Sequence, residues 1–131
     1  MKASKGVENM LGAFSISLNV KDIKKSFDFY SKLGFKMIGG KLSDHWVIMK
    51  QDEAVIGLFQ GMIEKNTITF NPGWNQNAEE VNPFNDIRVI QRQLMSKGIV
   101  LKRSADFTTK GPEYIELIDP DGNPILIDQH R

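Results

Sequence analysis

The strongest constraint on the fold is an order of elements that occurs twice along the chain. Apolar and polar residues alternate over residues 14–20, which is the period of a half-buried strand. Asp22 follows as a helix N-cap, and the predicted helix ends at Gly34, a residue type that favours the left-handed conformation after a helix. Three short strands are predicted next, with Gly39-Gly40 as the turn after the first of them: residues 35–38, 45–50 and 54–60.

The same order returns in the second half of the chain. Residues 67–71 alternate again, and a second helix is predicted from Asn85 or Asp86 to Gly98. Three further strands are predicted over residues 99–103, 114–118 and 124–128, the last two joined by the tight-turn signal Asp119-Pro120-Asp121-Gly122-Asn123. The chain therefore reads β-α-β-β-β twice, which predicts an α+β fold. We expect one domain over residues 1–131, with module one at about 12–61 and module two at about 66–130.

Composition excludes several classes of function. Lys and Arg number 17 against 16 Asp and Glu, so the bulk charge does not favour nucleic acid or an anionic membrane surface as a partner. There is no cysteine, which excludes disulfides, thiolate nucleophiles and iron–sulfur clusters. No apolar run approaches the ~20 residues of a membrane span, and the polar arm over residues 1–11 does not resemble a signal peptide. These features favour a cytoplasmic protein.

Several short motifs resemble the vicinal oxygen chelate superfamily, the group of glyoxalase I, extradiol dioxygenases and bleomycin-resistance proteins. The resemblance extends over residues 12–130 and rests on these segments: Val20-Lys21-Asp22, Ser26, Phe29-Tyr30, Leu33-Gly34-Phe35 and Asp119-Pro120-Asp121-Gly122-Asn123. It implies that the two β-α-β-β-β modules pair into an incomplete eight-stranded barrel with the helices outside. It also implies a pocket for a small organic ligand in the concave face, and a homodimer.

The resemblance also implies four strand positions at which metal-dependent members carry His, Gln or Glu. In this sequence these positions hold Ser15, Gly57, Thr67 and Leu126. A divalent ion needs imidazole or carboxylate donors, so we expect no metal at the usual place and no cofactor. An atypical metal site remains an alternative, and its donors would be His45, Glu116, Asp128 and His130. Against it, His45 is expected at the surface, and His130 lies near the C-terminus, where disorder is common.

Strand parity indicates which side chains share the concave face. Ser15 and Ser17 would share it with Thr67 and Thr69, while Ile68, Phe70, Ile125 and Ile127 face the helices. Three aromatic residues, Trp46, Phe59 and Trp74, either stack on a planar ligand or belong to the core and a loop anchor. Trp74 lies in the long loop over residues 71–84 and would be a lid in the first case. The predicted ligand-binding residues are Ser15, Ser17, Trp46, Gly57, Phe59, Thr67, Thr69, Trp74, Tyr114, Glu116 and Leu126.

These observations leave three functions to distinguish. The first is metal-free binding or sequestration of a small molecule. The second is an isomerase, lyase or dioxygenase that uses an atypical metal site or Glu116 as a proton acceptor or donor, although an ordinary surface carboxylate is the favoured alternative for Glu116. The third is a scaffold that dimerises and serves a partner protein. The sequence favours the first and does not name the ligand.

Overall fold

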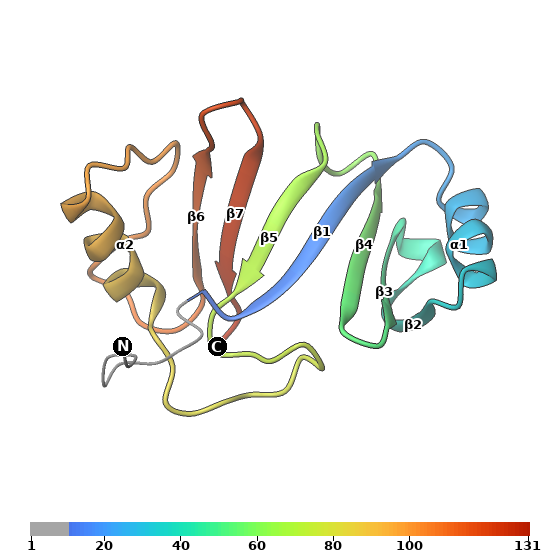
Figure 1. Cartoon of the computed structure of the whole chain (residues 1–131), viewed down its shortest axis with the longest axis horizontal. Helices are drawn as coiled ribbons and strands as arrows, with labels where there is room; N and C mark the ends of the chain where they lie inside the picture. The colour runs from blue at the N-terminus through green and yellow to red at the C-terminus, as the bar shows by residue number, and fades with distance from the viewer. Residues whose placement is uncertain (1–10) are drawn as a thin grey trace. The chain divides into compact units, whose positions relative to one another are not determined.

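The computed structural model describes residues 11–131, so nearly all of the polar arm expected over residues 1–11 lies outside the described residues. The helices are α1 (Ile23–Lys32) and α2 (Ile87–Ser96), with a short 3-10 helix, η1, at Leu42–Asp44. The strands are β1 (Ala13–Val20), β2 (Lys36–Lys41), β3 (Trp46–Gln51), β4 (Ala54–Gln60), β5 (Thr67–Asn71), β6 (Glu113–Ile118) and β7 (Pro124–Gln129) (Figure 1). The chain divides into two compact units, an N-terminal unit at Ser15–Ile68 and a C-terminal unit at Thr69–Arg131 with the stretch that ends at Phe14.

The N-terminal unit is a mixed sheet in the order β2-β3-β4-β1. Strand β3 runs antiparallel to β2 and β4, as the predicted meander requires, whereas β1 runs parallel to β4. Helix α1 packs on one face, because its stripe of Ile23, Phe27 and Tyr30 meets the apolar side chains of β3 and β4. The fully buried members of this core are Val47, Met49 and Leu58.

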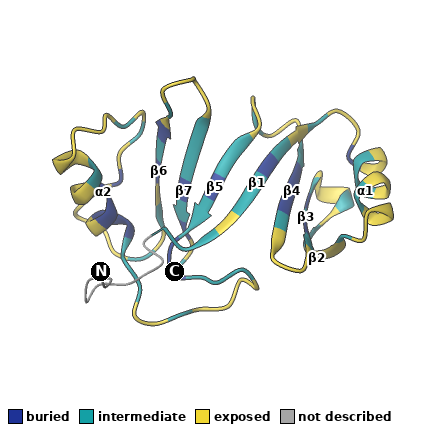
Figure 2. Ribbon diagram, in the orientation of Figure 1, coloured by how far each residue is buried: buried dark blue, intermediate teal, exposed yellow. Residues whose placement is uncertain are grey.

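The C-terminal unit has the strand order β5-β7-β6, with β6 and β7 antiparallel. Helix α2 covers one face through Ile87 and Ile90, which pack against Ile115 of β6 and Ile127 of β7. The predicted helix stripe and the helix-facing positions Phe70, Ile125 and Ile127 therefore belong to this core. Figure 2 shows the buried residues of α2 on the side of the helix nearest β6.

Both helices begin and end as the sequence predicts. The carboxylate of Asp22 accepts hydrogen bonds from the backbone N–H groups of Lys24 and Lys25, and that of Asp86 accepts one from Arg88. Gly34 and Gly98 follow the two helices with φ of 104° and 84°, the left-handed region in which a side chain is strained.

A second cap repeats in both units and joins each helix to the last strand of its own unit. The side-chain oxygen of Gln60, the last residue of β4, accepts a hydrogen bond of 2.8 Å from the backbone N–H of Ile23. The side-chain oxygen of Gln129, the last residue of β7, accepts one of 2.7 Å from the N–H of Ile87. Both N–H groups belong to the first turn, where a helix supplies no acceptor of its own. Gln60 and Gln129 are therefore equivalent positions of the internal repeat.

The strand predicted over residues 99–103 does not form, so the described residues contain seven strands rather than eight. Only Arg103 makes a single bridge, to Glu116 of β6. The apolar residues at 99–101 do not share a buried face, because Leu101 packs against the core around α2 whereas Val100 is 85% exposed. With one buried anchor, the segment gains too little from burial to continue the pairing.

The predicted turn at Gly39-Gly40 is also wrong, because both glycines lie inside β2. The pairing of β2 with β3 shifts by one residue between Met37 and Gly39, which marks a bulge. Gly40 has φ of 81°, and a Cβ there would lie 2.4 Å from the backbone oxygen of Trp46. The glycine therefore permits a close approach of two strands, and the chain turns later, in η1.

Candidate functional site

The N-terminal unit collects six of the predicted ligand-binding residues. Val47, Met49, Ile56 and Leu58 point toward α1, so the residues that alternate with them lie on the opposite face of the sheet. The pairing register places Ser17 beside Gly57, and Trp46 beside Phe59. Ser15 lies two residues before Ser17 on β1, so both side chains point to the same face of the sheet. The Thr67 hydroxyl donates a hydrogen bond of 2.9 Å to the Lys65 carbonyl.

An aromatic pair lies on this face. The rings of Trp46 and Phe59 stack with an interplanar angle of 5° and a centroid distance of 6.3 Å. The Phe59 ring also extends over Gly57, because a Cβ at position 57 would lie 2.6 Å from Phe59 Cε2 and 3.2 Å from Ile48 Cδ1. The space that a side chain at position 57 would take is thus filled by the Phe59 ring. We call Trp46, Gly57 and Phe59 the aromatic wall.

The residues at the superfamily's metal positions do not fit a metal ion. The repeated glutamine cap supports the register of these positions, because Gly57 and Leu126 each lie three residues before it, at Gln60 and Gln129. Glycine and leucine offer no donor, and the Phe59 ring covers position 57. Ser15 and Thr67 offer only neutral hydroxyls, which are weak ligands for divalent ions. Residues 11–131 also contain no group of three or more His, Asp or Glu side chains that could hold an ion.

The C-terminal unit holds the other five predicted residues. On the face of its sheet opposite α2, Tyr114 pairs with Asp128, and Glu116 pairs with Leu126. These residues alternate with the buried Ile115, Leu117 and Ile127. Thr69 of β5 is buried, and Asn71 of the same strand donates a hydrogen bond of 2.9 Å to the Asp128 carbonyl. This face is richer in titratable groups than its counterpart in the N-terminal unit.

Trp74 contacts His130 in the C-terminal unit. Its indole stacks on the imidazole of His130, with a centroid distance of 4.8 Å and an interplanar angle of 11°. His130 Nε2 lies 3.2 Å from Asp128 Oδ2. His130 was expected near a disordered end, but it has two side-chain partners. The alternation of Leu126, Asp128 and His130 on one strand face is the sequence signal that could have identified it.

The side chain of Arg103 contacts Tyr114 and Glu113. Its guanidinium lies over the Tyr114 ring at 3.8 Å, and its Nη1 lies 2.8 Å from Glu113 Oε1. Hydrogen bonds from the Asp106 backbone N–H, from Arg103 and from the Tyr114 N–H lower the pKa of Glu113 to about 2. Glu116, the predicted acid–base candidate, bonds Arg103 through backbone groups, and the guanidinium is engaged by Glu113 and Tyr114.

The long loop that carries Trp74 is held to its own unit at both ends. Gln76 makes two hydrogen bonds with the backbone of Phe14, as acceptor at 2.5 Å and as donor at 2.9 Å. The Arg131 guanidinium donates to the carbonyls of Gly73 and Val81 and to Asn82. These contacts give the loop a defined place in the C-terminal unit.

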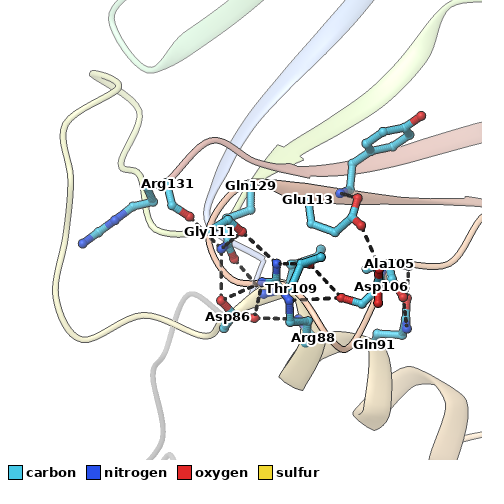
Figure 3. Close-up of polar contacts among 12 residues, drawn as sticks. Asp86, Arg88, Gln91, Ala105, Asp106, Thr109, Gly111, Glu113, Gln129 and Arg131 are labelled. Atoms are coloured by element: carbon cyan, nitrogen blue, oxygen red, sulfur yellow. Dashed lines mark hydrogen bonds and ion pairs between the residues drawn. The ribbon is translucent and has the colours of Figure 1, made fainter.

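A buried polar network lies at the end of β7 (Figure 3). The Gln129 side-chain amide donates to Asp86, to the Gly111 carbonyl and to the Arg131 carbonyl. Arg88 is also buried and donates to Asp86, to the Thr109 hydroxyl and to the Gly111 carbonyl. Burial of Asp86 acts to raise its pKa, but the hydrogen bonds from Arg88 and Gln129 outweigh it, and the pKa is lowered. The network therefore joins the start of α2, the end of β7 and the segment around Gly111.

The family follows from these features and from a direct comparison. The sequence matches the model of the Glyoxalase/Bleomycin resistance protein/Dioxygenase superfamily over residues 12–127. The chain therefore belongs to this superfamily, as its motifs predict. A search of curated proteins found no match.

Solved structures show the same fold at low sequence identity. A superfamily member from Vibrio splendidus 12B01 is 16% identical, with a TM-score of 0.59 over 88% of this chain and 97% of that one. A protein described as an NAD-dependent benzaldehyde dehydrogenase from Legionella pneumophila is 18% identical, with a TM-score of 0.65 over 90% and 99%. Homoprotocatechuate 2,3-dioxygenase from Brevibacterium fuscum (an E323L mutant) is 15% identical, with a TM-score of 0.51 over 91% and 32%.

These similarities confirm the predicted α+β fold class. The three proteins carry different descriptions, so the shared fold does not assign a reaction to this chain. No helix within residues 11–131 is long and apolar enough to cross a membrane.

Proposed function

We propose that the protein binds a small organic molecule without a metal ion. The observation that carries this proposal is the aromatic wall, where the Phe59 ring fills the space in front of Gly57 and stacks on Trp46. A metal ligand at position 57 would need that space for its own side chain. An apolar ring therefore occupies the space in which metal-dependent members of the superfamily place a metal ligand.

The chemistry of the wall favours a planar ligand with a few hydrogen-bonding groups. Aromatic rings contribute large apolar area, and Ser15 and Ser17 lie on the same sheet face as neutral polar groups. The side chains of Trp46 and Phe59 are only half-buried, so part of each ring is accessible in the described structure. The ligand of this surface is therefore expected to be aromatic and uncharged where it meets the wall.

Tryptophan fluorescence tests this proposal, because each unit carries one tryptophan. Trp74→Phe leaves Trp46 as the single reporter, and Trp46→Phe leaves Trp74. We expect a library of planar aromatic compounds to contain ligands that change Trp46 emission with saturable, micromolar to millimolar affinity. Phe59→Leu should weaken such a ligand at least severalfold. Phe107→Leu is the matched control, because Phe107 is exposed and belongs to the other unit.

No saturable change in Trp46 emission across the library would contradict the proposal. An equal loss of affinity in Phe59→Leu and Phe107→Leu would also contradict it, because the effect would then not belong to the wall. The enzyme alternative makes a different prediction. A stoichiometric divalent ion in the purified protein, or turnover that Glu116→Gln abolishes, would replace binding by catalysis as the function.

A homodimer and a cytoplasmic location complete the proposal, as the superfamily resemblance and the composition lead us to expect. Light scattering coupled to size-exclusion chromatography gives the mass directly. A mass near 29.6 kDa, twice the 14.8 kDa of one chain, supports the dimer, and a mass of one chain contradicts it.

A further inference from the structure

The strand registers of the N-terminal unit map the side chains that surround the aromatic wall. Lys41 of β2 pairs with Trp46 of β3. Trp46 pairs in turn with Phe59 of β4, and Phe59 pairs with Asn19 of β1. Directly paired residues of neighbouring strands project from the same face of a sheet. A row of four side chains therefore crosses the face opposite α1, with Lys41 at its β2 end and Asn19 at its β1 end.

Every charged residue of these four strands is a lysine on this same face. Strands β1 to β4 contain no Asp or Glu, and their charged residues are Lys36, Lys41 and Lys50. Lys50 follows the buried Met49, which points toward α1, so Lys50 points to the other face. Lys36 pairs with Lys50 and shares its face. The strand residues around the aromatic wall thus carry positive charge only.

Two of these lysines have no ion-pair partner in the part of the chain that the structure describes. Lys36 and Lys41 take part in none of the ion pairs found among residues 11–131. The Lys50 ammonium donates to the Asp52 carbonyl, which is a neutral acceptor. Lys36 and Lys50 also lie directly opposite each other, and like charges in such a pair are unfavourable. An anionic group bound at this face would offset the repulsion.

Lys41 is the lysine closest to the aromatic wall. It is the direct cross-strand neighbour of Trp46, and the Cβ atoms of such pairs are about 5 Å apart. Lys50 lies four residues further along β3 than Trp46, or roughly 13 Å away at about 3.3 Å per residue. At the other end of the row, the Asn19 amide donates to the Glu64 carbonyl at 3.3 Å. A ligand on the wall therefore meets a cation at the β2 end.

The Trp46 indole extends toward the strand that carries Lys41. A Cβ at Gly40 would lie 2.9 Å from Trp46 Cε3, so the ring borders the β2 backbone one residue before Lys41. A Cβ at Gly39 would make only ordinary contacts of 3.7 and 3.8 Å, both with Ile48. The two glycines of β2 thus add no side chain beside the indole, which is half-buried and keeps part of its surface accessible.

We propose that the aromatic wall binds planar aromatic anions, with the ring against Trp46 and Phe59 and the anionic group beside the Lys41 ammonium. The inference rests on the proposed function and narrows its ligand to a chemical class, the arenecarboxylates and related anions. The ring is uncharged where it meets the wall, and the charge lies on a substituent at the β2 end. Lys36 and Lys50 add a positive potential that attracts the anion at longer range and that salt screens.

The probes 2-naphthoate and 2-naphthamide form a matched pair, because they share a planar ring system and differ in the charge of one substituent. The readout is the NMR shift of the Trp46 indole N–H, assigned with Trp74→Phe, which leaves Trp46 as the single tryptophan. We expect both probes to shift this resonance saturably, and 2-naphthoate to bind roughly two- to fivefold more tightly at low ionic strength. In about 1 M NaCl, where charges are screened beyond about 3 Å, the two affinities should converge.

Substitutions at Lys41 test which cation is responsible. Lys41→Gln should lower the affinity for 2-naphthoate to that for 2-naphthamide and leave 2-naphthamide binding unchanged, whereas Lys41→Arg keeps the charge and should keep the preference. Lys24→Gln is the matched control, because Lys24 is an exposed lysine of α1, on the other side of the sheet. It changes the net charge of the protein by the same amount and should leave the binding of both probes unchanged.

Equal affinities of the two probes at low ionic strength would overturn the inference and leave the aromatic wall as a binding surface for neutral rings. Equal effects of Lys41→Gln and Lys24→Gln would also overturn it, because the preference would then reflect the net charge of the protein. No shift of Trp46 by either probe, up to its solubility limit, would overturn it as well, and the wider aromatic library tests the proposed function separately. The wild-type titrations need no variant that might fold poorly.

Discussion

Gln60 and Gln129 cap equivalent helices in the two units, yet they are built into very different surroundings. Each accepts a hydrogen bond from the first residue of its helix, at Ile23 and Ile87. Gln60 is half-buried, and its side chain caps α1 through this hydrogen bond. Gln129 is 1% exposed and donates in addition to Asp86, Gly111 and Arg131. Of the two capping glutamines, it is Gln129, in the C-terminal unit, that lies at the centre of a hydrogen-bond network.

Side-chain hydrogen bonds in the C-terminal unit compensate for a strand that this unit lacks. In the N-terminal unit α1 is followed by β2, which pairs with β3 along its length. In the C-terminal unit the segment after α2 makes a single strand bridge. Side chains of α2 hold that segment instead, because Gln91 bonds both the N–H and the carbonyl of Ala105, and Arg88 reaches Thr109 and Gly111. Hydrogen bonds from side chains of α2 thus take the place of the backbone hydrogen bonds that a paired strand would make.

Gln129 should contribute much more than Gln60 to the free energy of unfolding. Gln129→Ala removes four hydrogen bonds and leaves the buried Ile87 N–H without an acceptor, so it should lower the free energy of unfolding by roughly 2 to 4 kcal/mol. Gln60→Ala should cost only about 0.5 to 1.5 kcal/mol, the value of one partly exposed hydrogen bond. Urea unfolding measures both. Equal losses would contradict the view that the network belongs to one unit.

A second prediction concerns the segment that replaces the strand. Gln91 is 1% exposed, and Gln91→Ala should cost about 2 kcal/mol because it leaves both backbone groups of Ala105 unsatisfied. Gln93→Ala is the matched control, since Gln93 is an exposed glutamine of the same helix. Hydrogen exchange at Ala105 should accelerate in Gln91→Ala and stay unchanged in Gln93→Ala. Protection of Ala105 in both variants would show that another contact holds the segment.

A third prediction addresses the aromatic wall. Gly57→Ala places a Cβ 2.6 Å from Phe59 Cε2, so the ring must move, at a cost of roughly 1 to 2 kcal/mol. The emission of Trp46 should change, because its stacking partner shifts. In a Phe59→Ala background the same glycine substitution should cost little. A penalty of equal size in both backgrounds would mean that the backbone, and not the Phe59 ring, requires glycine.

Glu113 should make a modest contribution to stability at acidic pH. The pKa of Glu113 is lowered in the folded protein to about 2, chiefly by the Asp106 N–H and Arg103. Its contribution to stability is therefore present above the unfolded pKa of a glutamate and is lost as the pH falls toward 2. The Arg103 side chain that pairs with Glu113 is 37% exposed and therefore screened by solvent, so Glu113→Gln should only modestly reduce the fall of the urea midpoint at acidic pH. If Glu113→Gln left the dependence of the urea midpoint on acidic pH unchanged, this role of Glu113 would be contradicted.

Local signals in the sequence predicted local structure well. Asp22, Asp86, Gly34 and Gly98 act as helix caps, and the turn before β7 forms through Asp119, which accepts from the N–H groups of Asp121 and Asn123. These features depend on residues a few positions apart, so the residue types alone specify them. The apolar stripes of both helices reach their cores for the same reason.

Contacts between distant residues could not be read in the same way. Gln60 and Gln129 resemble surface glutamines at strand ends, and only the fold brings them to Ile23 and Ile87. The apolar residues 99–101 have the composition of a strand. A strand also needs a neighbouring strand to pair with and a common buried face, and composition reveals neither. The sequence shows that His130 lies near the chain end, but it does not indicate the contact with Trp74, which is 56 positions away.

Metal analysis tests whether the protein is free of metal, because the aromatic wall lies where a metal ligand would. The protein is purified without chelator or metal affinity resin, equilibrated with zinc, manganese, nickel and iron salts, desalted, and examined by elemental analysis. We predict that no divalent ion remains in stoichiometric amount and that Trp46 emission is the same before and after the treatment. One equivalent of bound ion per chain, with a change in Trp46 emission that a chelator reverses, would show instead that the protein binds a metal at this surface.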